Sequence, residues 1–298
     1  MRTLILGAGG QIGAHLVAAA DRRDYAVQGT WYRRPLADFV PLDLLDAEAV
    51  EDVVRDFEPA VIHIAAGMSR VDYAQSHAVE CEALAAEGTE NVVRAAAAIE
   101  AKVVLYTSDQ VVGECVHPAD EAAVCQPMSV YGRTQLQAEE LLRSRMPHAH
   151  LIVRTSAVYG PHDLPRNPAL HAVRRLRDGH TLTAASDRYF QPTFGPELAE
   201  ACLTLLEKEV CGTMHIVGGE RLTEAAFFKQ IAFIYGFDCD AIEAVPAEAL
   251  CEDAARPLSP WLDRSRFRSL LGSRAIGTVA ESLRSMRNVA RTAVRQAA

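Results

Sequence analysis

Short apolar runs alternate with longer amphipathic stretches through the first 160 residues. The apolar runs have strand length and are continuous, as in parallel strands buried on both faces; they cover residues 2–6, 26–30, 59–67, 102–107 and 150–159. Helical periodicity lies between them, at residues 14–20, 47–56, 78–99 and 129–142. This alternation predicts an α/β fold with a doubly wound parallel sheet of the Rossmann type.

The pattern loosens after Pro161. Further elements are predicted in the order helix, strand, helix, strand and helix, at residues 170–178, 181–185, 197–208, 212–218 and 223–235. Residues 237–275 have the character of loops and short helices, which predicts a second and smaller lobe in the carboxyl-terminal half.

Charge and cysteine content narrow the class of protein. A formal net charge of −9 argues against a nucleic-acid binder. The seven cysteines are scattered without a CxxC pair, which predicts mostly buried, reduced thiols, a cytoplasmic location and no metal site. Residues 3–20 are uncharged but contain four glycines, and no other run approaches a membrane span, so we expect neither a signal peptide nor a membrane contact.

Glycines 7, 10 and 13 stand between the first predicted strand and the first predicted helix. At this place they allow a tight turn, close approach of a pyrophosphate and close helix packing, which predicts a dinucleotide site. The expected cofactor contacts around this turn are Gly7, Gly10, Gln11, Ile12 and Gly13, with the small residues Ala65, Ala66 and Gly67 that end another strand.

Arg33 and Arg34 follow the second strand, where an NAD site usually carries an acidic residue. Two arginines favour the 2′-phosphate of NADP, although NAD stays possible and a solvated basic loop is the alternative interpretation. Asp43 and Leu44 are also expected near the cofactor, where Asp43 contacts the adenine or holds a turn.

A further candidate site combines a strand end with a helix. Ser108 comes at the carboxyl end of the strand 102–107, where ligands of open α/β sheets bind. Ser129 is a helix-start signal, and in the helix that follows Tyr131 and Gln135 are four residues apart and share a face. A lysine at the second position would tune the tyrosine as a proton donor, but this chain has glutamine there.

These motifs define the expected domains. Residues 1–160 form a dinucleotide-binding domain, to which 186–217 return, while 161–185 and 218–280 form a substrate lobe. Residues 281–298 are predicted to be a basic helical tail. Its arginines are expected on a solvated face, in preference to a membrane or RNA contact, and are Arg284, Arg287, Arg291 and Arg295.

Five ordered motifs carry a resemblance to a known family. They are the glycine turn, Thr107-Ser108-Asp109, Tyr131-Gly-Arg-Thr-Gln135, Arg154-Thr-Ser-Ala-Val-Tyr-Gly160 and Gln191-Pro-Thr-Phe194. Over residues 2–272 the chain resembles the extended short-chain dehydrogenase/reductases, and within them it is most similar to the dTDP-4-dehydrorhamnose reductase family. The regulatory β subunit of methionine adenosyltransferase, which binds NADP and a partner enzyme, is a side branch of that family.

The resemblance implies roles for particular residues. Members reduce the 4-keto group of a nucleotide-linked 6-deoxysugar with NAD(P)H. Ser108 would hydrogen-bond the substrate carbonyl, and Tyr131 would protonate the developing alkoxide. Arg256 lies in a segment similar to the family's closing segment and is expected to contact the substrate.

Two positions depart from the family pattern. Gln135 replaces a lysine that binds the nicotinamide ribose and lowers the pKa of the tyrosine, so glutamine keeps the hydrogen bond without the charge. Ala85 stands where the family usually has an asparagine that holds a relay water. The changes favour binding of the cofactor over rapid turnover.

Three functions therefore stay open. The first is an NADP-dependent reductase of a nucleotide-linked keto sugar, slow because of Gln135. The second is a non-catalytic NADP-binding regulatory or scaffold subunit. The third is a related epimerase or dehydratase, for which no further acid/base pair is evident. The expected partners are a small nucleotide sugar and either a second copy of the chain or a partner enzyme.

Overall fold

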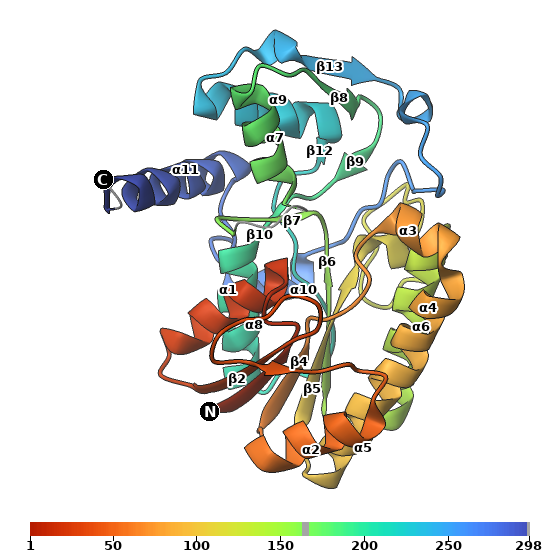
Figure 1. Ribbon diagram of the computed structural model, residues 1–298. Helices are drawn as coiled ribbons and strands as arrows, with labels where there is room; N and C mark the ends of the chain where they lie inside the picture. The colour runs from red at the N-terminus through yellow and green to blue at the C-terminus, as the bar shows by residue number, and fades with distance from the viewer. Residues whose placement is uncertain (163–166, 297–298) are drawn as a thin grey trace.

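Seven parallel strands form the central sheet in the computed structural model, which describes residues 1–162 and 167–296, with side chains as far as Val289 (Figure 1). Their order is β11-β6-β5-β4-β1-β2-β3. The strands are β1 (Arg2–Leu6), β2 (Ala26–Trp31), β3 (Val40–Pro41), β4 (Val61–Ile64), β5 (Lys102–Ser108), β6 (His150–Thr155) and β11 (Gly212–His215). The predicted doubly wound parallel α/β sheet is confirmed.

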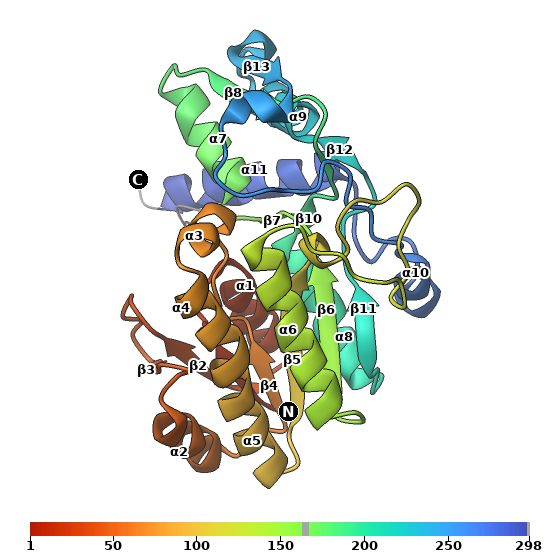
Figure 2. The same cartoon turned by 90° about the vertical axis from the view of Figure 1, so that its right-hand side faces the viewer.

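Helices cover both faces of this sheet (Figure 2). One face carries α1 (Gln11–Asp21), α8 (Gly195–Glu207) and α10 (Ser265–Leu271), and the other carries α2 (Ala47–Phe57), α4 (Ala78–Ala83), α5 (Thr89–Ala98) and α6 (Val130–Arg145). Successive strand residues point to opposite faces. Ile5 is therefore buried in the first layer, while Leu4 and Leu6 are buried in the second.

The strand order reverses direction between β1 and β4. In an open parallel sheet a crevice forms at the carboxyl ends of the strands beside such a reversal, because the two crossovers leave in opposite directions. The glycine turn follows β1, and the predicted Ala65–Ala66 contact follows β4. The topology therefore brings these two segments to one crevice.

A smaller lobe has a hydrophobic core of its own. Phe227, Ile231 and Tyr159 are buried in it. Its main elements are α7 (Pro168–Arg177), β8 (Leu182–Ala185), α9 (Glu224–Tyr235), β13 (Ile242–Val245) and α11 (Val279–Gln296). Two short strand pairs contribute to the same core: β7 (Val158–Tyr159) with β10 (Thr193–Phe194), and β9 (Tyr189–Phe190) with β12 (Leu222–Thr223).

Two predicted elements are interrupted. The strand expected at 150–159 ends at Thr155 and resumes as β7, because Ala157 adopts a left-handed backbone with φ of 39°. The helix expected at 78–99 contains a π-helical turn, Leu84–Gly88, between α4 and α5. Gly88 has no side chain, so this turn can lie close to Leu44. Wide helical turns of this kind are frequent at functional sites. The strand expected at 212–218 is shorter and ends at His215.

The tail helix is partly built into the lobe. Leu283 and Met286 of α11 are buried in its core, and Arg287 donates a hydrogen bond to the carbonyl oxygen of Ile234. Arg284 is exposed, as predicted for a solvated face, whereas the side chains of Arg291 and Arg295 lie outside the described residues. Of the seven cysteines only Cys81 and Cys202 are buried, so the prediction of mostly buried thiols is wrong.

Candidate functional site

The glycine turn has the geometry that its spacing predicts. Gly7 has a φ of 81°, and a Cβ there would lie 2.8 Å from the backbone of Ala66. A Cβ on Gly13 would lie 2.2 Å from the carbonyl oxygen of Gly7, so only glycine lets α1 approach β1 this closely. The amide of Gly10 donates to the same oxygen at 2.9 Å and closes the turn.

The start of α1 offers unpaired polar groups at this turn. Gly10 is its N-cap and provides no side chain, so the first amides of the helix are not capped by one. Gln11 contacts His15 through Nε2 at 3.3 Å, while its buried Oε1 has no hydrogen-bond partner among the described residues. Ile12 packs against the sheet. A glycine cradle with an uncapped helix start and an orphaned acceptor fits a bound pyrophosphate and ribose.

Across the turn, Ala65 and Ala66 directly follow β4. The amide of Ala65 donates to the carbonyl oxygen of Leu6 at 3.0 Å, which continues the β1–β4 pairing to the crevice. Gly67 follows and is exposed. A side chain at Gly7 would collide with the backbone of Ala65 and Ala66, so glycine at this position lets the two segments lie close together.

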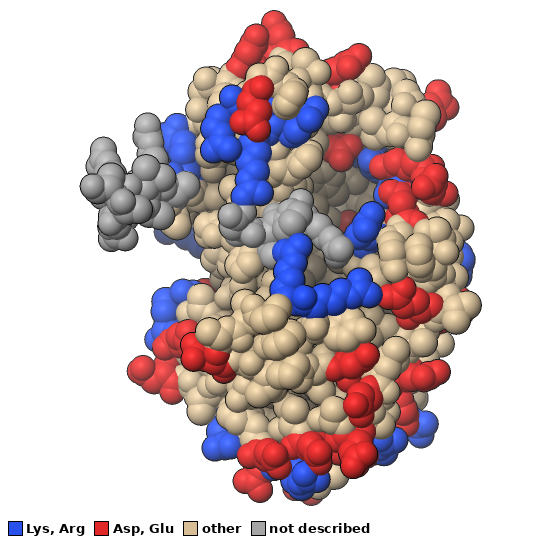
Figure 3. All heavy atoms as spheres, viewed as in Figure 1, with Lys and Arg blue, Asp and Glu red and all other residues tan. Residues whose placement is uncertain are grey.

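Basic residues lie at the end of β2. The Arg33 guanidinium lies 5.4 Å from the ring centre of Tyr32 and 3.5 Å from a carboxylate oxygen of Glu80. Both Arg33 and Arg34 are exposed. The face seen in Figure 3 is hollowed between the sheet domain and the lobe, and both basic and acidic side chains lie around the hollow. Both guanidinium groups therefore lie at the surface directly after β2, where an anion could reach them.

Asp43 and Leu44 lie after β3. The carboxylate of Asp43 accepts a hydrogen bond from the amide of Leu45 at 3.0 Å, so it holds a turn, which was one of its two predicted roles. Leu44 is buried, and its carbonyl oxygen accepts a hydrogen bond from Asn91 at 2.9 Å. This bond ties the loop to α5.

Ser108 and Tyr131 meet at the carboxyl end of β5. Ser129 caps α6 by accepting from the amide of Gly132 at 3.0 Å, and Tyr131 is in the first turn of that helix. Burial raises the pKa of Tyr131 to about 12, the nearby Ser108 hydroxyl opposes this shift, and the charge of Asp109 adds to it. The pair has the arrangement of a carbonyl binder and a proton donor.

A polar network extends from this pair into the lobe. Asp109 accepts hydrogen bonds from Ser108 at 2.9 Å and from Ser156 at 2.5 Å, and its burial raises the pKa of its carboxyl. Ser156 accepts from the amide of Gln191 at 3.3 Å, and the Gln191 side chain exchanges two hydrogen bonds with the backbone of Leu262. Asp109, Ser156 and Gln191 were not predicted as site residues. Each of them lies in one of the five motifs that carry the family resemblance, and this position could have identified it.

Gln135 is half-buried one turn after Tyr131 on α6. Ala85 is buried in the π-helical turn of the same layer. The lysine nearest along the chain, Lys102, donates to the carbonyl oxygen of Val210 at the opposite end of β5 from Ser108. It cannot supply the missing ammonium, because β5 separates the two ends by about 20 Å.

Arg256 lies between the lobe and the sheet domain. Its guanidinium donates to Asp72 of α3 (Val71–Ser76) at 2.7 Å and lies 3.2 Å from Glu252. Asp72 also accepts from the amide of Ala254 at 3.1 Å. The hydrogen bond from Arg256 is the main cause of a lowered pKa at Asp72, so the two form a stable cross-connection.

Metal-binding clusters and membrane-spanning helices are both absent from the described part of the chain. No group of three or more His, Cys, Asp or Glu side chains among these residues is placed to hold a metal ion. No helix there is long and apolar enough to cross a membrane.

Comparison with known proteins gives consistent matches over nearly the whole chain. A family described as the RmlD substrate binding domain matches residues 1–288. dTDP-4-dehydrorhamnose reductase of Salmonella typhimurium is 32% identical over 288 residues, which cover 90% of this chain and 91% of that protein. Methionine adenosyltransferase 2 subunit beta of Bos taurus is 27% identical over 277 residues, covering 90% and 82%.

The fold is also similar to that of solved structures. The crystal structure of dTDP-4-dehydrorhamnose reductase from Bacillus anthracis, solved in complex with NADP, superposes with a TM-score of 0.86. The match is 24% identical in sequence and covers 96% of this chain and 98% of that one. The extended short-chain dehydrogenase/reductase fold expected from the five motifs is therefore confirmed.

Proposed function

This chain belongs to the RmlD substrate binding domain family, and we propose that it is an NADP-dependent reductase of a nucleotide-linked 4-keto-6-deoxysugar. The observation that carries the proposal is that Ser108 and Tyr131 come together at the carboxyl end of β5, beside the crevice that the glycine turn borders. A 32% identical relative named dTDP-4-dehydrorhamnose reductase supports the substrate class.

The chemistry divides between cofactor and chain. The nicotinamide supplies a hydride when it is bound. Ser108 donates a hydrogen bond to the carbonyl oxygen and orients the keto group, and Tyr131 transfers its phenolic proton to the alkoxide oxygen as the carbonyl is reduced. The resulting phenolate is reprotonated from water. Asp109 accepts from the Ser108 hydroxyl until a substrate carbonyl replaces it as the acceptor, and through Ser156 it links the site to Gln191 of the lobe.

The residues of the glycine turn fit a dinucleotide. We assign the pyrophosphate to Gly7, Gly10 and the first residues of α1, and the 2′-phosphate of NADP to Arg33 and Arg34. Gln135 would hold the nicotinamide ribose by a hydrogen bond. The Arg33–Glu80 contact is exposed and therefore weak, so a phosphate can compete for the guanidinium.

A non-catalytic NADP-binding regulatory subunit is the second candidate. Gln135 and Ala85 favour it, because both positions differ from the pattern of the active family members. Methionine adenosyltransferase 2 subunit beta is also similar over 90% of this chain. Both candidates require the dinucleotide site, so they differ only in turnover.

One assay separates the two functions. NADPH oxidation is measured with dTDP-4-keto-6-deoxyhexoses for the wild type and for Gln135→Lys. A reductase turns over as wild type and gains about tenfold or more with the lysine, because an ammonium lowers the pKa of Tyr131. No turnover in either protein, with NADPH still bound tightly, would support the regulatory subunit. Turnover by the lysine variant alone would also reject the wild type as an enzyme.

The cofactor assignment has its own test. Arg33→Ala/Arg34→Ala is expected to weaken NADPH binding by roughly tenfold to a hundredfold and to leave NADH nearly unchanged, because only NADPH carries the 2′-phosphate. Arg175→Ala, an exposed arginine of α7, is the matched control. Equal losses for the two cofactors would contradict an NADP preference.

A further inference from the structure

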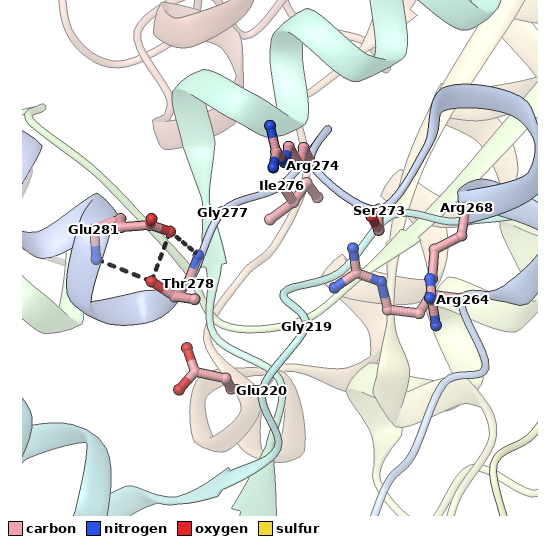
Figure 4. A pocket seen from close by; sticks show the side chains of 10 residues that line it. All are labelled: Gly219, Glu220, Arg264, Arg268, Ser273, Arg274, Ile276, Gly277, Thr278 and Glu281. Carbon is pink, nitrogen blue, oxygen red and sulfur yellow. Dashed lines mark hydrogen bonds between the residues drawn. The ribbon is translucent and has the colours of Figure 1, made fainter.

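A second pocket lies beyond β11, at the edge of the sheet opposite β3. It has a volume of about 690 Å³. Gly219 and Glu220 after β11, Arg264 and Arg268 at α10, and the segment 273–278 before α11 form its walls (Figure 4). The glycine turn follows β1, and three strands lie between β1 and β11 in the sheet, so this pocket is separate from the proposed dinucleotide site.

The carboxylates around the pocket are already used by backbone amides. Glu220 accepts from the amide of Val279 at 2.5 Å, and Glu281 accepts from the amide of Thr278 at 2.9 Å. Glu197 of α8 accepts from the amide of Gly277 at 3.1 Å. These bonds hold the start of α11, so the three carboxylates are directed at amides instead of at arginines.

The arginines of the pocket have no such partners. In the described part of the chain, Arg264, Arg268 and Arg274 form no ion pair, and the buried Nε of Arg264 has no hydrogen-bond partner. A Cβ on Gly219 would lie 2.5 Å from Nη1 of Arg264, so glycine leaves the room that this guanidinium occupies. Burial, together with the charge of Arg268, lowers the pKa of Arg264, and the charge of Glu197 opposes this shift only in part. An anion in the pocket would supply the acceptor that the Arg264 Nε lacks among the described residues.

We propose that this pocket binds a phosphorylated small molecule, with its phosphate oxygens at Arg264, Arg268 and Arg274. Guanidinium groups bind phosphate through paired hydrogen bonds, and three of them around one space favour a multiply charged group. The volume is in the range of sites for molecules of nucleotide size. The ligand would join α10 on the sheet to the start of α11, which carries Leu283 into the lobe core.

The probe is pyrophosphate, titrated calorimetrically into the full-length protein with saturating NADPH present. We expect one site per chain, weakened about tenfold or more by Arg268→Ala/Arg274→Ala, because this variant removes two of the three charged donors. Both replaced residues are exposed, so the variant should fold, and Arg175→Ala on α7 is the control. Arg264→Met tests the buried member and should lose most of the binding.

Three results would overturn the proposal. One is the absence of saturable binding up to about 10 mM pyrophosphate, a concentration above the range of specific sites. Another is an unchanged affinity in the double variant. The third is tighter binding of citrate than of pyrophosphate, which would make the ligand a carboxylate. If NADPH does not bind, the proposed function is contradicted. The effect of Arg268→Ala/Arg274→Ala on pyrophosphate binding still tests this pocket independently.

Discussion

Tyr131 and Gln135 show how one neighbouring side chain changes the chemistry of another. Burial raises the pKa of Tyr131 to about 12, and the nearby Ser108 hydroxyl offsets only part of the shift. A lysine one helical turn away would favour the phenolate by its charge, whereas the glutamine amide cannot. The phenol thus stays protonated at neutral pH and donates its proton weakly, because efficient proton transfer needs a pKa near the working pH.

This titration predicts a pH profile. In the alcohol-oxidation direction the phenolate is the base, so kcat/KM of the wild type should rise about tenfold per pH unit and continue to rise up to the highest pH that the fold tolerates. Gln135→Lys should reach its plateau at a lower pH, because the ammonium lowers the raised pKa. The measurement is initial rates of NADPH formation between neutral and alkaline pH. A wild-type plateau near neutrality would identify a different base.

Among the elements, the β1–α1 junction depends on the absence of a side chain at Gly13. The carbonyl oxygen of Gly7 occupies the place of a Cβ, at a separation of 2.2 Å. Helix and strand are both buried against the same core through Ile5 and Leu16, so neither can move away freely. Gly67 at the end of β4 differs, because no atom lies within 4 Å of its would-be Cβ.

Gly13→Ala should therefore destabilise the cofactor-free protein by about 1–3 kcal/mol, the usual cost of overpacking. Gly67→Ala is the matched control and should change the free energy of unfolding by less than about 0.5 kcal/mol, as surface substitutions do. Urea unfolding followed by circular dichroism measures both. Equal stability of the two variants would mean that α1 shifts to accept the methyl group.

Considered as a whole, the molecule is held together across its crevice by contacts between segments far apart in the chain. Arg256 reaches Asp72 of α3, and Gln191 connects Ser156 at the end of β6 with Leu262 near the carboxyl end. The lobe is thereby positioned over the carboxyl ends of the strands. We therefore expect a substrate at Tyr131 to contact both parts.

Arg256 allows this dependence to be tested. Arg256→Ala should raise the KM for the nucleotide sugar about tenfold, because a lost charged contact costs about 1.5 kcal/mol or more, with little change in the KM for NADPH. Asp72→Asn keeps the guanidinium and removes the charge that holds it, so it should raise that KM less. Steady-state kinetics with each substrate varied in turn distinguishes them. An equal effect of both variants would assign Arg256 to positioning the lobe alone.

The apolar pattern was sufficient for most strands and helices of the sheet domain. Runs such as 102–107 are buried on both faces whatever their neighbours are, so local hydrophobicity already specifies them. The interruptions were not predictable in this way. The break at Ala157 follows from its left-handed backbone beside Ser156, which is bound to Asp109 47 residues away. Periodicity also carries no signal for the π-helical turn Leu84–Gly88.

The same distinction between local pattern and tertiary packing holds for the site residues. The sequence by itself determined the glycine turn, the order of the parallel sheet elements and the Ser108 and Tyr131 pair, because these depend on short spacings and on strand ends. Only the tertiary structure decided that Arg256 meets Asp72, that α11 enters the lobe core, and that three arginines share a pocket with Gly219. Such contacts depend on which distant segments pack together, and local pattern contains no information about that choice.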